Sequence, residues 1–455
     1  MARKNVRRER ENDAMKWARE IFKKQFSPSR AASAMESSAE ELSEVGKVQR
    51  TAVFRSMATP WSKWYKAFKQ VWPVYLAAHL AVLLIDCLAV LFTYTRPYQS
   101  FGTYYQQVPT PKLSTLWDAW NIWPHDTPHF LEIARQGYDH AWLTAFFPLY
   151  PLLIRIVTPL TADHALIAAL LVANLAGLVM LVVFYQLVKE DFDHVRAMRT
   201  VLYFSLFPTA FFFMAGYSET TFLCCALLCF YHMRRGRWWL AGLFGLLAAL
   251  TRNTGIVLFV PFAYEYLRQH HFQLGNMRLN ALSALLIPLG LGLFMAYCYA
   301  LYRDPLAFQH AEVVWHHVLV LPWIGILGPI RTMIRVHSLL SFVVERNSIE
   351  LGSAFFILLL LMLSLFGPWR FPRTHLAYIL FAVIVWVIPL CSPVGSPDGS
   401  LPYQSVARYM LEVFPAFIVL AALGKFRMVH SVYLMVAGAL FFFLLTQFLL
   451  GYLII

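Results

Sequence analysis

The chain has 455 residues, of which 59% are hydrophobic and only 14% are charged, and its mean hydropathy is +0.55. A soluble domain typically carries about 25% charged residues, so this composition excludes a soluble globular protein and indicates a polytopic membrane protein. The net charge of +13 does not indicate a nucleic-acid partner, because residues 1–71 hold 16 Lys or Arg against 8 Asp or Glu and supply +8 of it.

Residues 1–71 are predicted to form a basic cytoplasmic N-terminal arm that is partly disordered. Residues 27–43 are rich in Ser, Ala and Glu, as linkers are. Three lysines at residues 63–69 stand just before the first apolar run, and basic residues beside a first span mark the cytoplasmic side. Residues 72–455 are expected to form the transmembrane domain.

The apolar runs of this domain predict an all-α bundle of about 11–12 transmembrane helices, since a span needs roughly 20 apolar residues. The predicted spans lie at residues 72–94, 165–188, 200–217, 219–233, 238–250, 255–267, 279–302, 351–367, 375–391, 409–424 and 428–454. Short basic connectors at 189–199, 234–237, 268–278, 370–373 and 425–427 are expected in the cytoplasm. The large loops 95–143 and 303–350 then fall outside.

Residues 144–160 are apolar but interrupted by three prolines. A full crossing here would place the basic connector 189–199 outside, so a re-entrant or short span is expected. Irregular backbone at membrane depth is tolerated where it lines a cavity, which makes this segment a candidate wall for a lipid-substrate cleft.

The first outside loop contains two acids, Asp118 and Asp126, among Trp and His residues. Asp126 precedes a helical stretch at 128–136, so it could cap that helix or act as a general base. His125, Asp126 and His129 could alternatively ligate a divalent metal, but a third firm ligand is not obvious and a metal is not favoured.

Polar residues also stand at the outside ends of predicted spans. Tyr217, Ser218 and Glu219 form a polar turn between two apolar helices, where an acid is costly unless it is paired or reaches water. Arg252 and Arg408 each occupy an outside end, where they could bind a phosphate in bidentate fashion, or form salt bridges or headgroup contacts.

Several blocks of the sequence resemble the PIG-V family of mannosyltransferases, which belongs to the GT-C superfamily of membrane glycosyltransferases. The first block runs from Asp126-Thr-Pro-His-Phe-Leu-Glu-Ile-Ala-Arg-Gln-Gly-Tyr138 to Ala145-Phe-Phe-Pro-Leu-Tyr-Pro151. Further similar blocks follow in order at residues 207–219, 251–255 and 304–315, and at Arg408-Tyr409 with Pro415. The similarity therefore extends from about residue 75 to 425, with only the N-terminal arm outside it.

This resemblance implies a GT-C-type fold and an inverting transfer of a sugar, by family a mannose, from a polyprenyl-phosphate donor. The acceptor would be a hydroxyl of a lipid- or glycan-linked molecule on the extracytoplasmic face, and no cofactor is expected. The loop aspartate would be the catalytic base: Asp126 keeps the family register, whereas Asp118 keeps the family's Trp-Asp dipeptide eight residues too early. Substrate-binding residues are expected to be His125, His129, Tyr138, Tyr217, Glu219, Arg252, Arg408 and Tyr409.

Two other classes of function remain open from the sequence. A transporter or flippase of a lipid-linked or polar solute would also have about a dozen spans, but it predicts charges near the bilayer midplane and an internal repeat. A non-catalytic scaffold is the other alternative, because the Trp-Asp dipeptide is displaced from the family register. For location, the bacterial or archaeal plasma membrane is expected.

Overall fold

The computed structural model describes residues 60–89, 120, 126–273, 275, 277–336, 338, 341–395, 403 and 405–451. Every regular element in these residues is a helix, which confirms the all-α class, and a single isolated bridge joins His317 to Val394. The chain divides into two compact units, Met1–Lys66 and Ala67–Ile455. Nearly all of the predicted arm 1–71 lies outside the described residues and stays a prediction.

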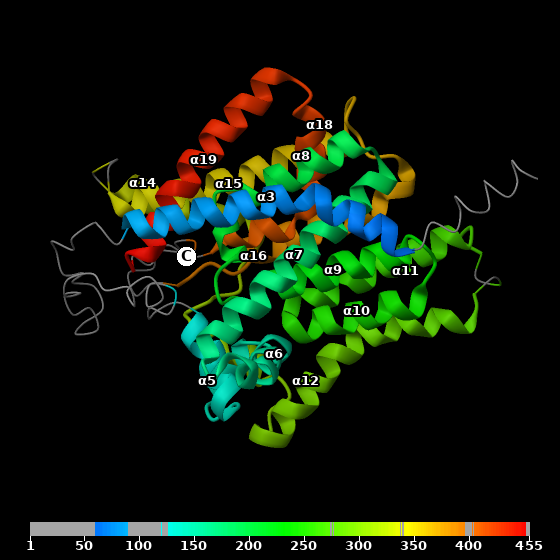
Figure 1. Cartoon of the computed structure of the whole chain (residues 1–455). Coiled ribbons are helices and arrows are strands. Elements are labelled where there is room, and N and C mark those ends of the chain that lie inside the picture. Colours follow the sequence, from blue (N-terminus) through cyan, green and yellow to red (C-terminus); the bar gives the residue numbers. More distant parts are fainter. Residues whose placement is uncertain are drawn as a thin grey trace, which may run out of the picture. The chain divides into compact units, whose positions relative to one another are not determined.

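The described helices follow one another along the chain (Figure 1). The α-helices are α3 (Pro60–Ala89), α5 (Thr127–Gln136), α6 (Leu149–Val157), α7 (Ala165–Asp191), α8 (His194–Ser205), α9 (Glu219–Met233), α10 (Trp238–Thr251), α11 (Phe259–Gln269), α12 (Leu286–Tyr302), α13 (Ala307–Ala311), α14 (Pro322–Arg335), α15 (Phe342–Leu365), α16 (Leu376–Leu390), α17 (Val406–Tyr409), α18 (Phe414–Leu423) and α19 (Arg427–Leu449). Short 3-10 turns precede or follow several of them, among them η3 (Ala141–Ala145), η4 (Thr158–Thr161), η5 (Ala210–Phe213), η6 (Asn253–Leu258) and η10 (Met410–Glu412).

Six helices of the described chain are long and apolar enough to cross a membrane, which makes this a multi-pass membrane protein. They are Ser62–Ala89, Ala165–Asp191, Leu279–Tyr302, Phe342–Leu365, Arg373–Leu390 and Arg427–Leu449. The pair Val406–Glu412 and Phe414–Leu423, bent by 80°, makes a seventh if it is one span. This is fewer than the 11–12 spans expected, because several apolar runs, such as α9 and α10, form helices of only 14 or 15 residues.

The span predicted at 200–217 is wrong as a continuous helix. Helix α8 ends at Ser205, and the chain then turns before the short 3-10 helix Ala210–Phe213. Pro208 explains the break, because proline lacks an N–H and disfavours helical backbone in the residue before it.

The proline-rich segment 144–160 forms η3, the nine-residue helix α6 and η4. A helix of this length rises about 13 Å, less than half of the hydrocarbon core. Figure 1 shows α6 lying with α5 at one end of α7, and these three helices pack on one another. The short length agrees with a partial crossing, although the position of this segment in a bilayer stays a prediction.

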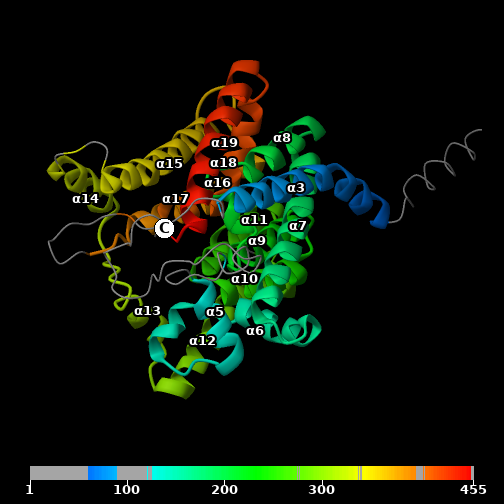
Figure 2. The ribbon, with the colours of Figure 1, turned by 60° about the vertical axis from the view of Figure 1, so that its left-hand side comes forward.

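Helix α7 packs against α9, α9 against α10, and α10 against α12. The contact between α10 and α12 is close because it contains glycine: a Cβ added to Gly290 would lie 2.6 Å from the carbonyl oxygen of Leu246. Small residues let membrane helices approach in this way. In Figure 2, α15 lies beside α18, and these two helices also pack together.

The connectors predicted to be cytoplasmic meet at one cluster of charges. The Arg234 guanidinium contacts Asp191 at 3.2 Å and Glu265 at 3.3 Å, and it donates a hydrogen bond to the Thr374 carbonyl. Asp191 and Arg234 belong to two of the predicted connectors. Glu265 stands three residues before a third connector and Thr374 one residue after a fourth, so residues in or beside four of the five connectors are tied together. The polar residues predicted to lie outside gather in a different place, described next.

Candidate active site

Asp126 stands immediately before helix α5. Pro128 in the first turn starts this helix, since proline needs no hydrogen-bond donor there, and Gly137 with φ +83° ends it. Within the described chain, the Asp126 side chain makes no capping hydrogen bond to α5. The carboxylate instead receives a hydrogen bond from Arg408 Nη1, 2.7 Å from its Oδ2. In the described structure the Asp126 side chain therefore does not cap α5, although its position in the sequence would have allowed it to.

The backbone of Asp126 is also held in place. Its N–H donates to the Tyr217 hydroxyl at 3.1 Å. Gly216, next to this tyrosine, approaches the first residue of α5 so closely that an added Cβ would lie 2.9 Å from Thr127 Cγ2. The turn before α9 therefore determines where α5 begins.

Glu219, the first residue of α9, lies between two arginines. Its Oε1 is 2.8 Å from Arg252 Nη1 and 3.4 Å from Arg408 Nε. The side chain is only 1% exposed. A carboxylate buried to this extent is stable only when paired, and here two guanidiniums pair it.

Arg252 follows α10 and continues the series of ion pairs to Glu412. Arg252 Nε lies 2.9 Å from Glu412 Oε1, while Glu412 Oε2 accepts a hydrogen bond from the Thr254 hydroxyl at 3.0 Å. Sequence reasoning did not select Glu412. The spacing Arg408-x-x-x-Glu412 could have indicated it, because this spacing places two opposite charges on one helix face within an apolar run.

We call Asp126, Arg408, Glu219, Arg252 and Glu412 the ion-pair chain. Three carboxylates and two guanidiniums alternate along it, which leaves one net negative charge. The exposed fraction of the side chains is 28% at Asp126 but 6% at Arg408 and 1% at Glu219. A substrate can therefore reach the chain at its Asp126 end.

Aromatic rings surround the guanidinium of Arg408. Its Cζ lies 5.3 Å from the Phe212 ring centroid and 5.2 Å from the rings of Tyr217 and Tyr409. Arg252 Cζ is likewise 5.2 Å from Tyr409. Such rings favour a planar guanidinium over an ammonium and hold it in orientation.

A buried glutamate on α15 orients the turn that carries Arg408. Glu350 is 2% exposed, and its Oε2 accepts a hydrogen bond of 2.5 Å from the Ala407 N–H. Ser405, two residues earlier, has a left-handed φ of +66°. Glu350 was not expected from the sequence, because the N–H that it accepts belongs to Ala407, 57 positions away.

Five of the eight expected substrate-binding residues belong to this site or contact it directly, apart from the catalytic candidate Asp126, and four of them are Glu219, Arg252, Arg408 and Tyr217. Tyr409 joins them through its ring. Tyr138 does not, since its hydroxyl donates to the Phe146 carbonyl at 2.6 Å and its ring packs on Phe294. Asp118 and His125 lie outside the described residues.

His129 lies one turn from Asp126 on α5, but its side chain is fully buried. Its ring is 5.2 Å from that of Trp142, 5.1 Å from Phe146 and 5.3 Å from Trp315. Burial lowers the pKa of His129, and the negative charge of Asp126 opposes part of that effect. This placement gives His129 a packing role, joining α5 to the second outside loop, rather than contact with substrate.

The second outside loop brings a further carboxylate near the ion-pair chain. Burial raises the pKa of Glu312; His317 and Arg252 lower it, and Asp126 raises it further. His317 Nδ1 lies 3.0 Å from the Ser392 carbonyl, and the Val318 N–H donates to the Pro393 carbonyl at 3.1 Å. These contacts fix the loop beside the segment that leads to α17.

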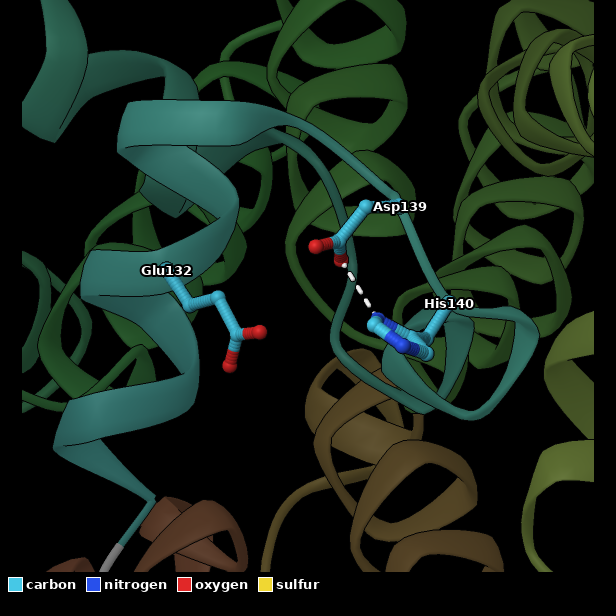
Figure 3. Close-up of side chains that lie close together, drawn as sticks. All are labelled: Glu132, Asp139 and His140. Atoms are coloured by element: carbon cyan, nitrogen blue, oxygen red, sulfur yellow. Dashed lines mark ion pairs between the residues drawn. The ribbon is translucent and has the colours of Figure 1, made fainter.

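Among the described residues, one group of side chains could hold a metal ion. Glu132, Asp139 and His140 offer ligand atoms within 4.8 Å of one another. Figure 3 shows Glu132 on α5 facing the following loop, where His140 and Asp139 form an ion pair of 3.0 Å. All three are partly or fully exposed, and exposed acidic groups commonly cluster without a metal.

Comparison with known families gives a match over much of this region. Residues 80–319 match the family described as Mannosyltransferase (PIG-V). This stretch is more than half of the chain and contains Asp126, Glu219 and Arg252. The chain belongs to the PIG-V mannosyltransferase family.

Individual members of the PIG-V family are similar over part of their length. The GPI alpha-1,6-mannosyltransferase 2 of Rattus norvegicus is 30% identical over 200 residues, which is 40% of this chain and 41% of that protein. The GPI mannosyltransferase 2 of Drosophila pseudoobscura pseudoobscura is 33% identical over 107 residues, 21% of this chain and 24% of that protein. The matched parts are thus less than half of these relatives. Both are animal proteins and lend no support to a bacterial or archaeal membrane.

Two solved membrane enzymes resemble the chain at low sequence identity. ArnT from Cupriavidus metallidurans, bound to undecaprenyl phosphate, has a TM-score of 0.45 and 14% identity, covering 76% of this chain and 59% of that one. The archaeal oligosaccharyltransferase AglB from Archaeoglobus fulgidus has a TM-score of 0.38 and 12% identity, covering 84% and 56%.

Proposed function

We propose that the protein is an inverting mannosyltransferase that moves mannose from a polyprenyl-phosphate donor to a hydroxyl of a glycolipid or glycan at the extracytoplasmic face. One observation carries the proposal: a partly exposed carboxylate, Asp126, ends a buried chain that contains two arginines. Such a pairing supplies both a base for the acceptor and positive charge for a phosphate leaving group. The membership of the PIG-V family supports the choice of sugar and donor.

In the proposed reaction, Asp126 removes the proton of the acceptor hydroxyl. The acceptor oxygen then attacks the anomeric carbon of mannose, while the bond from that carbon to the phosphate oxygen breaks. The electron pair leaves with polyprenyl phosphate, and the proton stays on Asp126 until water removes it. Arg408, with Arg252 behind it, would balance the charge that develops on the phosphate.

The ion pair between Asp126 and Arg408 implies an order in which the two substrates bind. Arg408 Nη1 and Asp126 Oδ2 are 2.7 Å apart before any donor is present, so the carboxylate and a donor phosphate would compete for the same guanidinium. A phosphate that takes Arg408 would release Asp126 toward the acceptor. The donor is therefore expected to bind first, and the base becomes available only afterwards.

The acceptor is proposed from the relatives. The proteins named GPI alpha-1,6-mannosyltransferase 2 point to a glycolipid acceptor with a free 6-hydroxyl on its sugar. Transport of a solute is less well supported, because the described charges of the site gather at helix ends such as Arg252 and Glu219 rather than within a span. The compartment and the cytoplasmic N-terminus stay predictions.

The test is transfer by the purified protein in lipid nanodiscs, with polyprenyl-phosphate mannose and a synthetic mannoside acceptor. The wild type is expected to form product with the anomeric configuration inverted relative to the donor. Asp126→Asn is expected to lose at least about 100-fold in turnover, as for removal of a general base, whereas Asp118→Asn retains activity. Full activity of Asp126→Asn would reject the assignment of the base, and no transfer from any lipid-linked mannose would reject the enzyme.

A further inference from the structure

Helix α3 carries three polar residues on one face within its otherwise apolar part, residues 71–89. Tyr75, His79 and Asp86 are four and seven residues apart, which places them in one row. The Tyr75 hydroxyl donates to the Asn174 carbonyl at 3.1 Å, and His79 Nε2 lies 2.6 Å from Asn174 Oδ1. These two residues hold α3 to α7.

Asp86 makes a contact of another kind. Its Oδ2 accepts a hydrogen bond of 3.0 Å from Trp120 Nε1, a residue of the first outside loop. Asp86 is 4% exposed and Trp120 is 7% exposed, so water does not replace this bond. The second carboxylate oxygen, Oδ1, has no hydrogen-bond partner among the described residues. A carboxylate kept in an apolar helix with one partner is costly, which indicates a role for that partner.

Trp120 connects this carboxylate to the surroundings of Asp126. Its ring lies 5.8 Å from that of Phe448 on α19. The Phe448 ring in turn lies 5.4 Å from Phe212 and 6.3 Å from Tyr217. Tyr217 accepts the N–H of Asp126. A contiguous series of buried rings thus extends from Asp86 to the proposed base.

Trp120 is also close to the base along the chain. Trp120 and Asp126 are six positions apart, a distance that cannot exceed about 20 Å even in a fully extended chain. Breaking the hydrogen bond between Trp120 and Asp86 would leave a buried N–H and a buried carboxylate without partners. The free-energy cost of this loss favours the bonded arrangement.

We propose that Asp86 is a positioning residue: its hydrogen bond holds the Trp120 indole, and the rings packed behind that indole hold Asp126 at the start of α5. The inference rests on the proposed function, because that function makes Asp126 the residue whose position matters for catalysis. Asp86 touches no member of the ion-pair chain, so it acts on Asp126 only through Trp120 and the rings behind it.

The first measurement is turnover of a double-mutant cycle in nanodiscs. Asp86→Leu and Trp120→Phe are each expected to lower kcat roughly 10- to 100-fold while the donor KM stays within about threefold, as for a base displaced by about 1 Å. The double variant should be no slower than the slower single variant, because both remove one bond. Asp86→Asn keeps an acceptor for the indole and should retain activity within about threefold.

The matched control is His79→Phe, which removes one of the two side-chain contacts that hold α3 to α7 but leaves the bond to Trp120 in place. It should keep the wild-type kcat. Equal losses in His79→Phe and Asp86→Leu would overturn the proposal in favour of a general loss of α3 attachment. Additive losses in the double variant, or an unchanged kcat in Trp120→Phe, would also overturn it.

The second measurement does not require transfer. Hydrogen–deuterium exchange of the amides of α5 should become faster in Trp120→Phe, which preserves most of the ring, than in His79→Phe or the wild type. Unchanged exchange would reject the positioning role even if the wild type were active. Conversely, faster exchange with a wild type that transfers no sugar would support the positioning role and reject the proposed function.

Discussion

Replacing Asp126 with asparagine should strengthen the binding of the donor phosphate while it abolishes most of the turnover. The carboxylate and the phosphate compete for Arg408, and asparagine has the same size but no charge. In the free protein Arg408 Nη1 is 2.7 Å from Asp126 Oδ2, with Arg408 6% exposed and Asp126 28% exposed. The variant therefore frees the guanidinium before the donor arrives.

The size of this effect follows from the burial of the pair. A fully exposed ion pair contributes about 0–1 kcal/mol, and a hydrogen bond to a charged group in a protein interior about 1.5–3 kcal/mol. Asp126 is partly exposed, so a value of about 1 kcal/mol is appropriate, which corresponds to roughly fivefold tighter binding.

The assay is titration of polyprenyl phosphate into nanodisc-embedded protein by calorimetry. The matched control is Asp139→Asn, which removes an exposed carboxylate of the same loop that pairs only with His140 among the contacts of the described chain. It should bind like the wild type. Weaker binding by Asp126→Asn than by the wild type would refute the competition for Arg408.

Four further predictions follow from the site. Arg408→Lys should lower kcat roughly tenfold or more in the transfer assay, because one ammonium cannot replace a guanidinium that contacts two carboxylates and three rings. Gly216→Ala should reduce the melting temperature and kcat together, since its Cβ would press on Thr127. Burial lowers the pKa of His129 in the folded protein, so below a pH of about 6.5 the unfolded chain takes up the proton more readily. The melting temperature should therefore fall as the pH decreases below this value, and His129→Phe should reduce that decrease. Chelation with EDTA should leave the transfer rate unchanged within about twofold, because arginine neutralises the leaving group. The variant Glu132→Gln should keep the same rate. If EDTA lowered the rate and Mn²⁺ restored it in the wild type but not in this variant, the metal would be assigned to the Glu132 cluster.

Much of the site could be predicted because each of its parts is a polar residue in an apolar sequence. Glu219 and Arg252 stand at ends of short hydrophobic helices, where a charge has a high cost and so requires a partner or a function. The family resemblance then placed Asp126 in register with the helix that follows it. The structure brings these three together with Arg408, in agreement with the expectation that they share one face.

What the sequence could not provide is the pairing among these charges. Glu412 and Glu350 are buried acids whose partners, Arg252 and the Ala407 N–H, lie far away in the chain. Local periodicity carries no information on such contacts. The same limit explains His129, whose position one turn after Asp126 indicated the site, while tertiary packing of three aromatic rings buries it.

The described chain has fewer long helices than the 11–12 spans expected, for a related reason. Apolar runs such as 200–217 fulfil the composition of a membrane helix, but Pro208 and the polar contacts after it break the helix. Thr209, for example, donates its hydroxyl to the Ala407 carbonyl at 3.0 Å. Such irregular segments are stable in an apolar surrounding only when other parts of the protein satisfy their backbone, which sequence reasoning does not show.

In the proposed mechanism Asp126 is the base and the two arginines bind the donor phosphate. The most direct measurement is the single-turnover rate of sugar transfer with polyprenyl-phosphate mannose already bound, in the wild type and in Asp126→Asn. A base at this position predicts that the variant holds the donor at least as tightly as the wild type and transfers its mannose at least about 100-fold more slowly. A variant that binds the donor and transfers its mannose at the wild-type rate would contradict the assignment of Asp126 as the base.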